Sequence, residues 1–340
     1  MRVGIFGAGA IGCYLGGRLA SSGASVAIVG RPRIRDEIAT HGLTTIDLEG
    51  RSLRAEVVVE TDPSALAGCD VVLVCVKSAQ TEEAAETLAK FLAPDALVVS
   101  MQNGVRNADV LRDKISNVLG GIVGFNVVSK GSGVFRRATS GPLVIEDREG
   151  ASAIVATLQR AGFEAFAERD IVSAQWSKLV MNLNNAVSAL SNAPTREIVL
   201  TPGYRKCVAM IVAEALAVMR AAGIRPKRIG PLPVGVFPFA LRLPTPLIRV
   251  VARAQLQIDP EARSSMSEDL ARGRNTEVDF LNGEIVRLAR SVGRRAPINE
   301  RVVALVHEVE ASGRGSPKMS PAELASALRT PSSPETAASK

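Results

Sequence analysis

A glycine-rich turn near the start of the chain is the feature that most restricts its fold. Residues Gly7-Ala8-Gly9-Ala10-Ile11-Gly12 have the spacing GxGxxG, directly after an apolar run at 3–6 and at the head of a helical pattern at 11–22. In a strand–turn–helix unit the first glycine permits the tight turn, and the second lets a ligand approach the backbone. The third lets the helix pack closely on the strand. The motif therefore predicts an α/β unit with a ligand-binding turn at the start of its first helix.

The apolar pattern of the first half predicts a parallel sheet. Apolar runs of strand length occur at residues 3–6, 25–29, 57–60, 70–76, 96–101, 117–125 and 142–146. Continuous apolar strands separated by helical segments are typical of a sheet that is covered by helices on both faces. We therefore predict a Rossmann-type α/β N-terminal domain over residues 1–170.

The second half has a different periodicity. Helical patterns occur at residues 171–190, 204–222, 260–271, 277–292 and 300–311, so we predict an all-helical C-terminal domain over residues 171–312. The proline-rich stretch 224–247 is expected to be an irregular connector that covers a surface, or simply a spacer. Residues 313–340 are rich in Ser, Pro and Ala and are expected to be disordered, apart from a short helix at 321–328.

Composition excludes several classes of function. A length of 340 residues favours two domains, and 4% aromatic residues with a net charge of +7 disfavour a nucleic-acid partner. Two histidines and four cysteines without a CxxC pair argue against a metal site and a disulfide framework. No segment has the length of a membrane span. We expect a cytoplasmic protein with a small-molecule partner, no membrane and no metal, and the modest positive charge suits an anionic ligand.

The end of the second predicted strand indicates which dinucleotide would bind. An acidic residue there would bind the ribose 2′-hydroxyl of NAD, but the chain has Gly30-Arg31-Pro32-Arg33 and no carboxylate before Asp36. A guanidinium can bind a 2′-phosphate bidentately. Arg31 therefore favours NADPH/NADP over NAD, although a solvated loop arginine is the alternative interpretation.

Two further polar residues follow predicted strands. Lys77 ends the run 70–76, and Asn103 follows the run 96–101. Each alone is explained as a solvated lysine or as a turn asparagine. Open α/β sheets, however, bind ligands beyond the carboxyl ends of their strands, where Gly7 and Arg31 are also predicted. The coincidence of the four favours a binding edge.

The helical half contains an unusual polar stripe. Lys178, Asn182 and Asn185 stand at i, i+4 and i+7, on one face of a predicted helix whose other residues are mostly apolar. A lysine on such a face could protonate a ketone oxygen while Asn182 orients the substrate, or the stripe could face solvent between domains. Further along, Ser264 or Ser265 and the pair Thr276–Glu277 are explained by helix capping.

Together these segments resemble ketopantoate reductase (2-dehydropantoate 2-reductase), a family of NADPH-dependent enzymes. The resemblance covers residues 1–311. It rests on GAGAIG, the strand-end lysine, QNG, the W-x-K-L-x-x-N helix, and SSM followed by R-x-T-E-x-D-x-L-N-G.

The resemblance implies a role for each matching residue. Gly7–Gly12 and Arg31 would hold the diphosphate and 2′-phosphate, while Lys77 and Asn103 would lie beside the nicotinamide and substrate. Lys178 would be the general acid. The substrate would bind Asn182, Ser265 and an asparagine at 184 or 185, and Glu277 would lie near the cofactor and the lysine. The family pattern has an asparagine eight positions after the lysine, where this chain has Ala186.

We therefore expect the reduction of 2-dehydropantoate to pantoate, a step in pantothenate and coenzyme A biosynthesis. Three alternatives are a related reductase of another 2-oxo acid, a non-catalytic NADP-binding sensor, and an NAD-linked dehydrogenase running in the oxidative direction. The sequence leaves a homodimer open.

Overall fold

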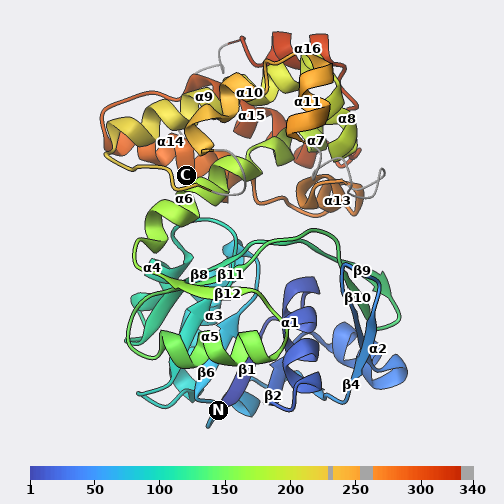
Figure 1. Cartoon of the computed structure of the whole chain (residues 1–340), viewed down its shortest axis with the longest axis vertical. Helices are drawn as coiled ribbons and strands as arrows, with labels where there is room; N and C mark the ends of the chain where they lie inside the picture. Colours follow the sequence, from blue (N-terminus) through green and yellow to red (C-terminus); the bar gives the residue numbers. More distant parts are fainter. Residues whose placement is uncertain (229–232, 253–262, 331–340) are drawn as a thin grey trace. The chain divides into compact units, whose positions relative to one another are not determined.

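The chain forms two compact units, Met1–Gln175 and Trp176–Lys340. The computed structural model describes residues 1–228, 233–252 and 263–330 (Figure 1). The first unit is an α/β domain, and the described residues of the second form helices and connecting turns without a strand. Both parts of the predicted fold class are confirmed.

The first unit is built on an eight-stranded sheet in the order β12-β11-β8-β7-β6-β1-β2-β5. Strands β5, β2, β1, β6, β7 and β8 are parallel, β11 is antiparallel to β8, and β12 is parallel to β11. The strand order reverses at β1, so the sheet has the switch point at which doubly wound folds bind ligands. The strands are β1 (Arg2–Phe6), β2 (Ser25–Val29), β5 (Val59–Glu60), β6 (Val71–Val74), β7 (Leu97–Ser100), β8 (Val118–Val123), β11 (Leu143–Glu146) and β12 (Ala165–Glu168).

Helices cover both faces of this sheet. Strand β6 shows why the apolar runs are continuous, because Val71 and Leu73 belong to one hydrophobic cluster and Val72 and Val74 to the other. The first cluster includes residues of α1 and α5, and the second includes residues of α3 and α4. The helical elements of this unit are α1 (Ala10–Ser21), α2 (Pro32–His41), η1 (Pro63–Leu66), η2 (Ser78–Gln80), α3 (Thr81–Phe91), α4 (Asn107–Arg112) and α5 (Ala151–Arg160).

A second, four-stranded sheet was not expected from the sequence. Its order is β4-β3-β10-β9, and it joins two insertions that are far apart in the chain. The strands are β3 (Leu43–Ile46), β4 (Ser52–Ala55), β9 (Val127–Gly131) and β10 (Val134–Arg137). They are short and partly exposed, so none contains the continuous apolar run by which the other strands were recognised.

The second unit is organised around α9 (Pro202–Ala221), which packs against α7, α8, α10, α14, α15 and α16. The other described helices are α6 (Ile171–Asn182, which begins in the first unit), α7 (Asn184–Ser191), α8 (Thr195–Leu200), η3 (Val234–Val236), α10 (Phe237–Ala240), α11 (Thr245–Val251), α13 (Ser265–Ala271), η4 (Val278–Phe280), α14 (Asn282–Ser291), α15 (Pro297–Ser312) and α16 (Pro321–Ala327). In the described ranges, no helix is both long enough and apolar enough to cross a membrane.

Three predicted helices differ from the observed ones. The helix predicted at 171–190 is divided at Leu183, where the amide donates to the Val180 carbonyl three residues back, as in a 3₁₀ turn. The helix predicted at 277–292 begins only at Asn282, after the short turn η4. The helix predicted at 260–271 begins at Ser265, and its first residues 260–262 lie outside the described part of the chain.

The proline-rich stretch is irregular at residues 224–228, as predicted, but most of residues 234–247 are helical. It contains η3, α10 and the start of α11, while residues 229–232 lie outside the described residues. The buried guanidinium of Arg205 fastens it to the domain by donating to the carbonyls of Leu241 and Leu243. The same group donates to the carbonyls of Val199 and Leu200 at the end of α8. Five donors in one rigid fork allow arginine to bind several carbonyls at once.

The short helix expected at 321–328 is confirmed as α16 (Pro321–Ala327), whereas the expected disorder of residues 313–320 and 329–330 is wrong. Helix α16 starts with a capping box, in which Ser320 and Glu323 exchange side-chain and backbone hydrogen bonds. The segment is attached to the domain by the Tyr204 hydroxyl, which donates to the Met319 carbonyl, and by buried Leu324. Residues 331–340 of the predicted tail lie outside the described residues.

Candidate functional site

The glycine turn between β1 and α1 is shaped by two steric requirements. Gly7 has φ +109°, a left-handed conformation that favours glycine. A Cβ atom at Gly12 would lie 2.1 Å from the Gly7 carbonyl oxygen, so only glycine fits where the helix crosses the turn. Gly9 differs, because a Cβ atom there would lie 4.0 Å from its nearest neighbour, the Cys75 carbonyl oxygen. The space beside Gly9 is therefore open to a ligand.

The first turn of α1 is suited to an anion. Its N-cap, Gly9, supplies no side-chain hydrogen bond, and no acidic residue lies in the first turn. The amides of Gly7 and Ala8 already donate to the Val29 carbonyl. The amides that start the helix, beginning with Ala10 and Ile11, are the ones that a phosphate would use, and the helix dipole favours negative charge there.

Arg31 lies at the carboxyl end of β2 as the N-cap of α2. Its side chain is exposed and has no hydrogen bond or ion pair among the residues that the structure describes. The neighbouring arginines are engaged, because Arg33 binds Glu37 at 3.0 Å and Arg35 binds Asp36 at 2.7 Å. Of the three guanidinium groups, Arg31 is therefore the one available to an anionic ligand.

Lys77 and Asn103 lie in the loops that follow β6 and β7. Lys77 is the N-cap of η2, and Asn103 stands between β7 and α4. Because β6 and β7 are adjacent and parallel, these loops leave the same edge of the sheet as the glycine turn and Arg31. The two loops are joined directly, since the Ser78 hydroxyl donates to the Asn103 carbonyl at 2.9 Å. The four features predicted in this half of the chain thus share one sheet edge.

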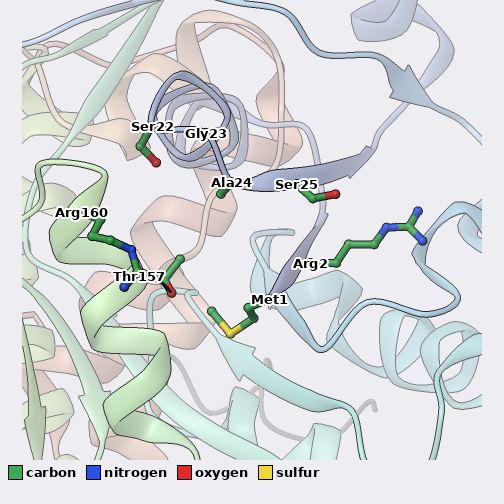
Figure 2. A pocket seen from close by; sticks show the side chains of 8 residues that line it. All are labelled: Met1, Arg2, Ser22, Gly23, Ala24, Ser25, Thr157 and Arg160. Carbon is green, nitrogen blue, oxygen red and sulfur yellow. Dashed lines mark hydrogen bonds between the residues drawn. The ribbon is translucent and has the colours of Figure 1, made fainter.

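A pocket of about 470 Å³ lies elsewhere in the first unit (Figure 2). It is lined by the start of β1, the turn from α1 into β2, and two residues of α5: Met1, Arg2, Ser22, Gly23, Ala24, Ser25, Thr157 and Arg160. These residues include the amino ends of β1 and β2, whereas the predicted ligand-binding residues follow the carboxyl ends. The pocket is therefore separate from the candidate site.

Lys178 is the chemically distinctive residue of the second unit. It lies in α6 between the buried residues Ser177 and Leu179, and its side chain is partly buried. Loss of hydration lowers the pKa of Lys178 from its ordinary value to about 8, while the negative charge of Glu277 acts in the opposite direction. The structure thus places these two predicted site residues within electrostatic reach of each other.

The local fold around Glu277 explains its position. It precedes η4 as the N-cap residue, and the Thr276 hydroxyl accepts a hydrogen bond from the Val278 amide. The Thr276 amide in turn donates to the Glu310 carboxylate of α15 at 2.7 Å. The Thr276 hydroxyl therefore binds the first amide of η4, but Glu277 and not Thr276 is the N-cap, so the predicted cap of a helix with Glu277 in its first turn is wrong.

The predicted asparagine stripe is divided between two helices. Asn182 is the last residue of α6, and Asn185 belongs to α7 beyond the tight turn at Leu183. The three residues therefore do not lie on one continuous helix, which corrects that prediction. Ala186, where the family pattern has an asparagine, is fully buried, whereas Asn184 and Asn185 are partly exposed.

Ser264 and Ser265 have different roles in the fold. Ser264 is the N-cap of α13, since its side chain accepts from the Ser267 amide and donates to the Asn185 carbonyl. Ser265 begins α13 with an exposed side chain. The structure thus places Ser265 next to the residue that binds the backbone of Asn185.

The described residues offer little to metal or thiol chemistry. No group of three or more His, Cys, Asp and Glu among them could hold a metal ion. All four cysteines are free, and burial raises the pKa of Cys13 to about 12 and that of Cys207 to about 11. Thiols with such values are poor nucleophiles at neutral pH.

Sequence reasoning missed the polar side chains behind the loops after β6 and β7, namely Ser78, Thr81, Gln102 and Asn107. They are buried and hydrogen-bonded to one another. The only sequence signal was an accumulation of polar residues directly after two apolar strands, which is also typical of ordinary exposed loops.

Comparisons with known proteins match nearly the whole chain. The family described as ketopantoate reductase PanE/ApbA matches residues 3–150, and its C-terminal counterpart matches residues 170–310. A 2-dehydropantoate 2-reductase of Archaeoglobus fulgidus is 30% identical over 315 residues, which are 91% of this chain and 98% of that protein. A similar enzyme of Halobacterium salinarum is 29% identical over 328 residues, 92% of this chain and 100% of its own.

Solved structures also match most of the chain. The crystal structure of a PanE/ApbA family ketopantoate reductase from Ralstonia eutropha JMP134 matches with a TM-score of 0.80 and 34% identity, over 92% of this chain and 100% of that one. A D-mandelate dehydrogenase, in a structure with NADH and anilino(oxo)acetate, matches with a TM-score of 0.76 and 24% identity, over 92% and 99% of the two chains. The latter similarity concerns the fold.

Proposed function

The chain belongs to the ketopantoate reductase PanE/ApbA family of oxidoreductases, and from this premise we propose that it reduces 2-dehydropantoate to pantoate with NADPH. Family membership confirms the resemblance found in the sequence. The reaction would serve pantothenate biosynthesis. The observation that carries the proposal is Lys178, a partly buried lysine of α6 whose pKa is lowered to about 8 and which lies within electrostatic reach of Glu277.

The glycine turn fits a dinucleotide. The open space beside Gly9 and the uncapped first turn of α1 are the two properties that a diphosphate requires. Gly7 and Gly12 serve this function indirectly, because they allow the turn and the helix to form. When bound, the reduced nicotinamide supplies the hydride.

Arg31 supports NADPH over NADH. Its guanidinium is exposed and lies at the end of β2, where a dinucleotide fold presents a residue to the ribose of the adenosine half. No carboxylate precedes it there to repel a 2′-phosphate. Charge-assisted bidentate contacts from arginine are the strongest that a side chain offers to a phosphate.

Lys178 would act as the proton donor. A 2-oxo group that receives hydride at carbon develops negative charge on oxygen, and the Lys178 ammonium would stabilise this charge and then transfer a proton from Nζ. A pKa of about 8 keeps the group mostly protonated at neutral pH and makes it a better acid than an ordinary lysine. The neutral amine would regain its proton from water, with Glu277 favouring the charged form.

The remaining predicted residues would orient the substrate. Asn103 in the first unit and Asn182, Asn185 and Ser265 in the second carry amide and hydroxyl groups, which suit the carboxylate, keto and hydroxyl oxygens of 2-dehydropantoate. Lys77 would act beside the nicotinamide. The homodimer and the cytoplasmic location stay predictions.

A related 2-oxo acid is the second candidate substrate. Ala186 is fully buried at the position where the family pattern has an asparagine, so no amide is offered there. A reductase of another branched or aromatic 2-oxo acid would keep Lys178 and change this part of the site. The fold similarity to a D-mandelate dehydrogenase is compatible with this alternative.

The experiment is a substrate panel. NADPH consumption is measured by absorbance with 2-dehydropantoate and with other branched and aromatic 2-oxo acids, each repeated with NADH. The proposal predicts the highest kcat/KM for 2-dehydropantoate with NADPH. A higher value for another 2-oxo acid would establish the second candidate, and no turnover with any of them would contradict both.

A further inference from the structure

A buried polar network lies behind the two loops that carry Lys77 and Asn103. Its side chains are Ser78 of η2 and Thr81 at the start of α3, which follow β6, and Ser100 at the end of β7, Gln102 in the loop after it and Asn107 at the start of α4. All five are buried in the first unit. Burial of a polar group costs free energy unless its hydrogen bonds are restored, so such a network must be closely specified by the fold.

Asn107 is the centre of the first half of the network. Its Nδ2 atom donates to the Asn103 carbonyl and to the Ser78 hydroxyl, the latter at 3.2 Å. The Ser78 hydroxyl donates to the same Asn103 carbonyl at 2.9 Å. Two donors, one from η2 and one from α4, therefore fix the orientation of the peptide group between Asn103 and Gly104.

Thr81 is the centre of the second half. Gln102 Nε2 donates to its hydroxyl oxygen at 2.7 Å, and Ser100 donates to the other end of the Gln102 amide at 3.0 Å. The Thr81 hydroxyl lies 2.8 Å from both the Asn107 Oδ1 atom and the Ser78 carbonyl. Its single proton serves these two acceptors in turn, so Thr81 connects both loops.

The network is complete. Among the described residues, only Ser267 Oγ and Asn282 Oδ1 are buried side-chain atoms without a partner, and neither belongs to it. A fully satisfied network fixes one arrangement of the loops, because any other arrangement would leave buried donors unpaired.

We propose that Thr81 and Asn107 are positioning residues of the reductase: they hold the loop after β6 and the loop after β7 in one fixed relation, so that Lys77 and Asn103 act on the nicotinamide and the substrate as a preorganised pair. The inference rests on the proposed function, because its test measures the rate of the proposed reaction. Neither residue touches the ligands in this account. Their contribution is geometric, and displacement of a reacting group by about 1 Å can reduce a rate about 100-fold.

The test uses matched threonine variants in the full-length protein. Thr81→Val keeps the shape and removes the hydroxyl, and Thr81→Ser retains the hydroxyl. The control is Thr157→Val, since Thr157 is also buried in the first unit but donates to the Ala153 carbonyl within α5. For each variant we would measure Tm, kcat and KM for the 2-oxo acid, and the affinity for adenosine 2′,5′-bisphosphate, which represents the adenosine half of the coenzyme.

We expect Thr81→Val to lower kcat/KM for the 2-oxo acid by about 10- to 100-fold while the affinity for the bisphosphate is unchanged. Thr81→Ser should restore most of the activity. Thr157→Val should lower Tm to a similar extent and leave both functional readouts unchanged. Equal kinetic effects of the two valine variants, or a parallel loss of bisphosphate affinity in Thr81→Val, would show a purely structural network and overturn the proposal.

A failure of the proposed function is distinguished by the wild-type protein. If wild type reduces no 2-oxo acid, the proposed reaction is wrong, and the inference is then tested by binding alone. In that case Thr81→Val should weaken NADPH binding without changing bisphosphate binding, because only NADPH carries the nicotinamide. Equal changes for both ligands would overturn the positioning role as well.

Discussion

At the scale of single residues, the proposed preference for NADPH depends on one guanidinium, that of Arg31. We predict that Arg31→Ala raises the KM for NADPH about 10- to 100-fold, the loss expected for charge-assisted hydrogen bonds, and changes the KM for NADH much less. Steady-state kinetics with both coenzymes checks this. An equal effect on NADPH and NADH would remove the 2′-phosphate role.

The chain provides its own control for this prediction. Arg33 lies two residues away and is also exposed, but its guanidinium is paired with Glu37. Arg33→Ala removes the same charge and should change the KM for NADPH far less than Arg31→Ala. Similar effects of the two variants would show that general positive charge, and not a contact made by Arg31, attracts the coenzyme.

The pKa of Lys178 gives a pH dependence. A proton donor is active in its charged form, so kcat/KM should be constant below the pKa and fall as the pH rises through about 8. Glu277 raises this pKa, so Glu277→Gln should move the alkaline limb to lower pH. The measurement is the pH profile of both proteins. An unmoved limb, or one moved to higher pH, would contradict the coupling between the two residues.

Several residues of the candidate site could be proposed from the sequence because each leaves a local signal. The glycines of the turn follow from steric rules, and Arg31 follows from the missing carboxylate at the end of β2. Lys178 follows from a cation in an apolar helix. Thr81 and Asn107 could not be predicted, because their side-chain partners are 21 to 29 residues away in the chain and meet only when β6 and β7 pair.

At the scale of elements, we expect different glycines of the turn to be required for folding and for binding. A Cβ atom at Gly12 would collide with the Gly7 carbonyl, whereas one at Gly9 meets open space and an ordinary backbone conformation, φ −79°. We predict that Gly9→Ala folds with nearly the wild-type Tm but loses most of its NADPH affinity. Gly12→Ala should have a lower Tm as well as a lower NADPH affinity. Calorimetry and fluorescence titration of both variants decide this, and normal NADPH binding by Gly9→Ala would contradict a diphosphate at this turn.

Strands could be predicted from the sequence where both of their faces are buried. Strand β6 could be recognised because both of its faces are apolar, and its position in the sheet follows from the order of such strands. The four strands of the small sheet are short and partly polar, and the pairing of β3 with β10 across about 90 residues left no local pattern. The break at Leu183 left only a weak signal, because the flanking Asn182, Asn184 and Asn185 are poor helix formers but no glycine or proline marks the break.

At the scale of the whole molecule, the C-terminal segment belongs to the fold of the second unit. Leu324 of α16 is completely buried against that unit, whereas Leu247 of α11 is 52% exposed. We predict that Leu324→Ala lowers the free energy of unfolding by about 2–5 kcal/mol and that Leu247→Ala changes it by less than about 0.5 kcal/mol. Denaturant titration measures both. Equal stabilities would contradict the attachment of α16.

Composition could not predict this attachment. Ser, Pro and charged residues dominate the segment, and two leucines are the only large aliphatic residues within α16 and its C-cap. A capping box and two well-placed leucines suffice because α7 and α9 already present a surface to α16. The burial of a segment by other parts of the chain cannot be predicted from the sequence of that segment alone.

The central claim is that Lys178 donates the proton in an NADPH-dependent reduction, and the turnover of Lys178→Ala tests it most directly. General acid catalysis contributes about 10²- to 10⁴-fold, so kcat with 2-dehydropantoate should fall by this factor while NADPH still binds with wild-type affinity. Turnover by the variant close to that of the wild type would contradict the account.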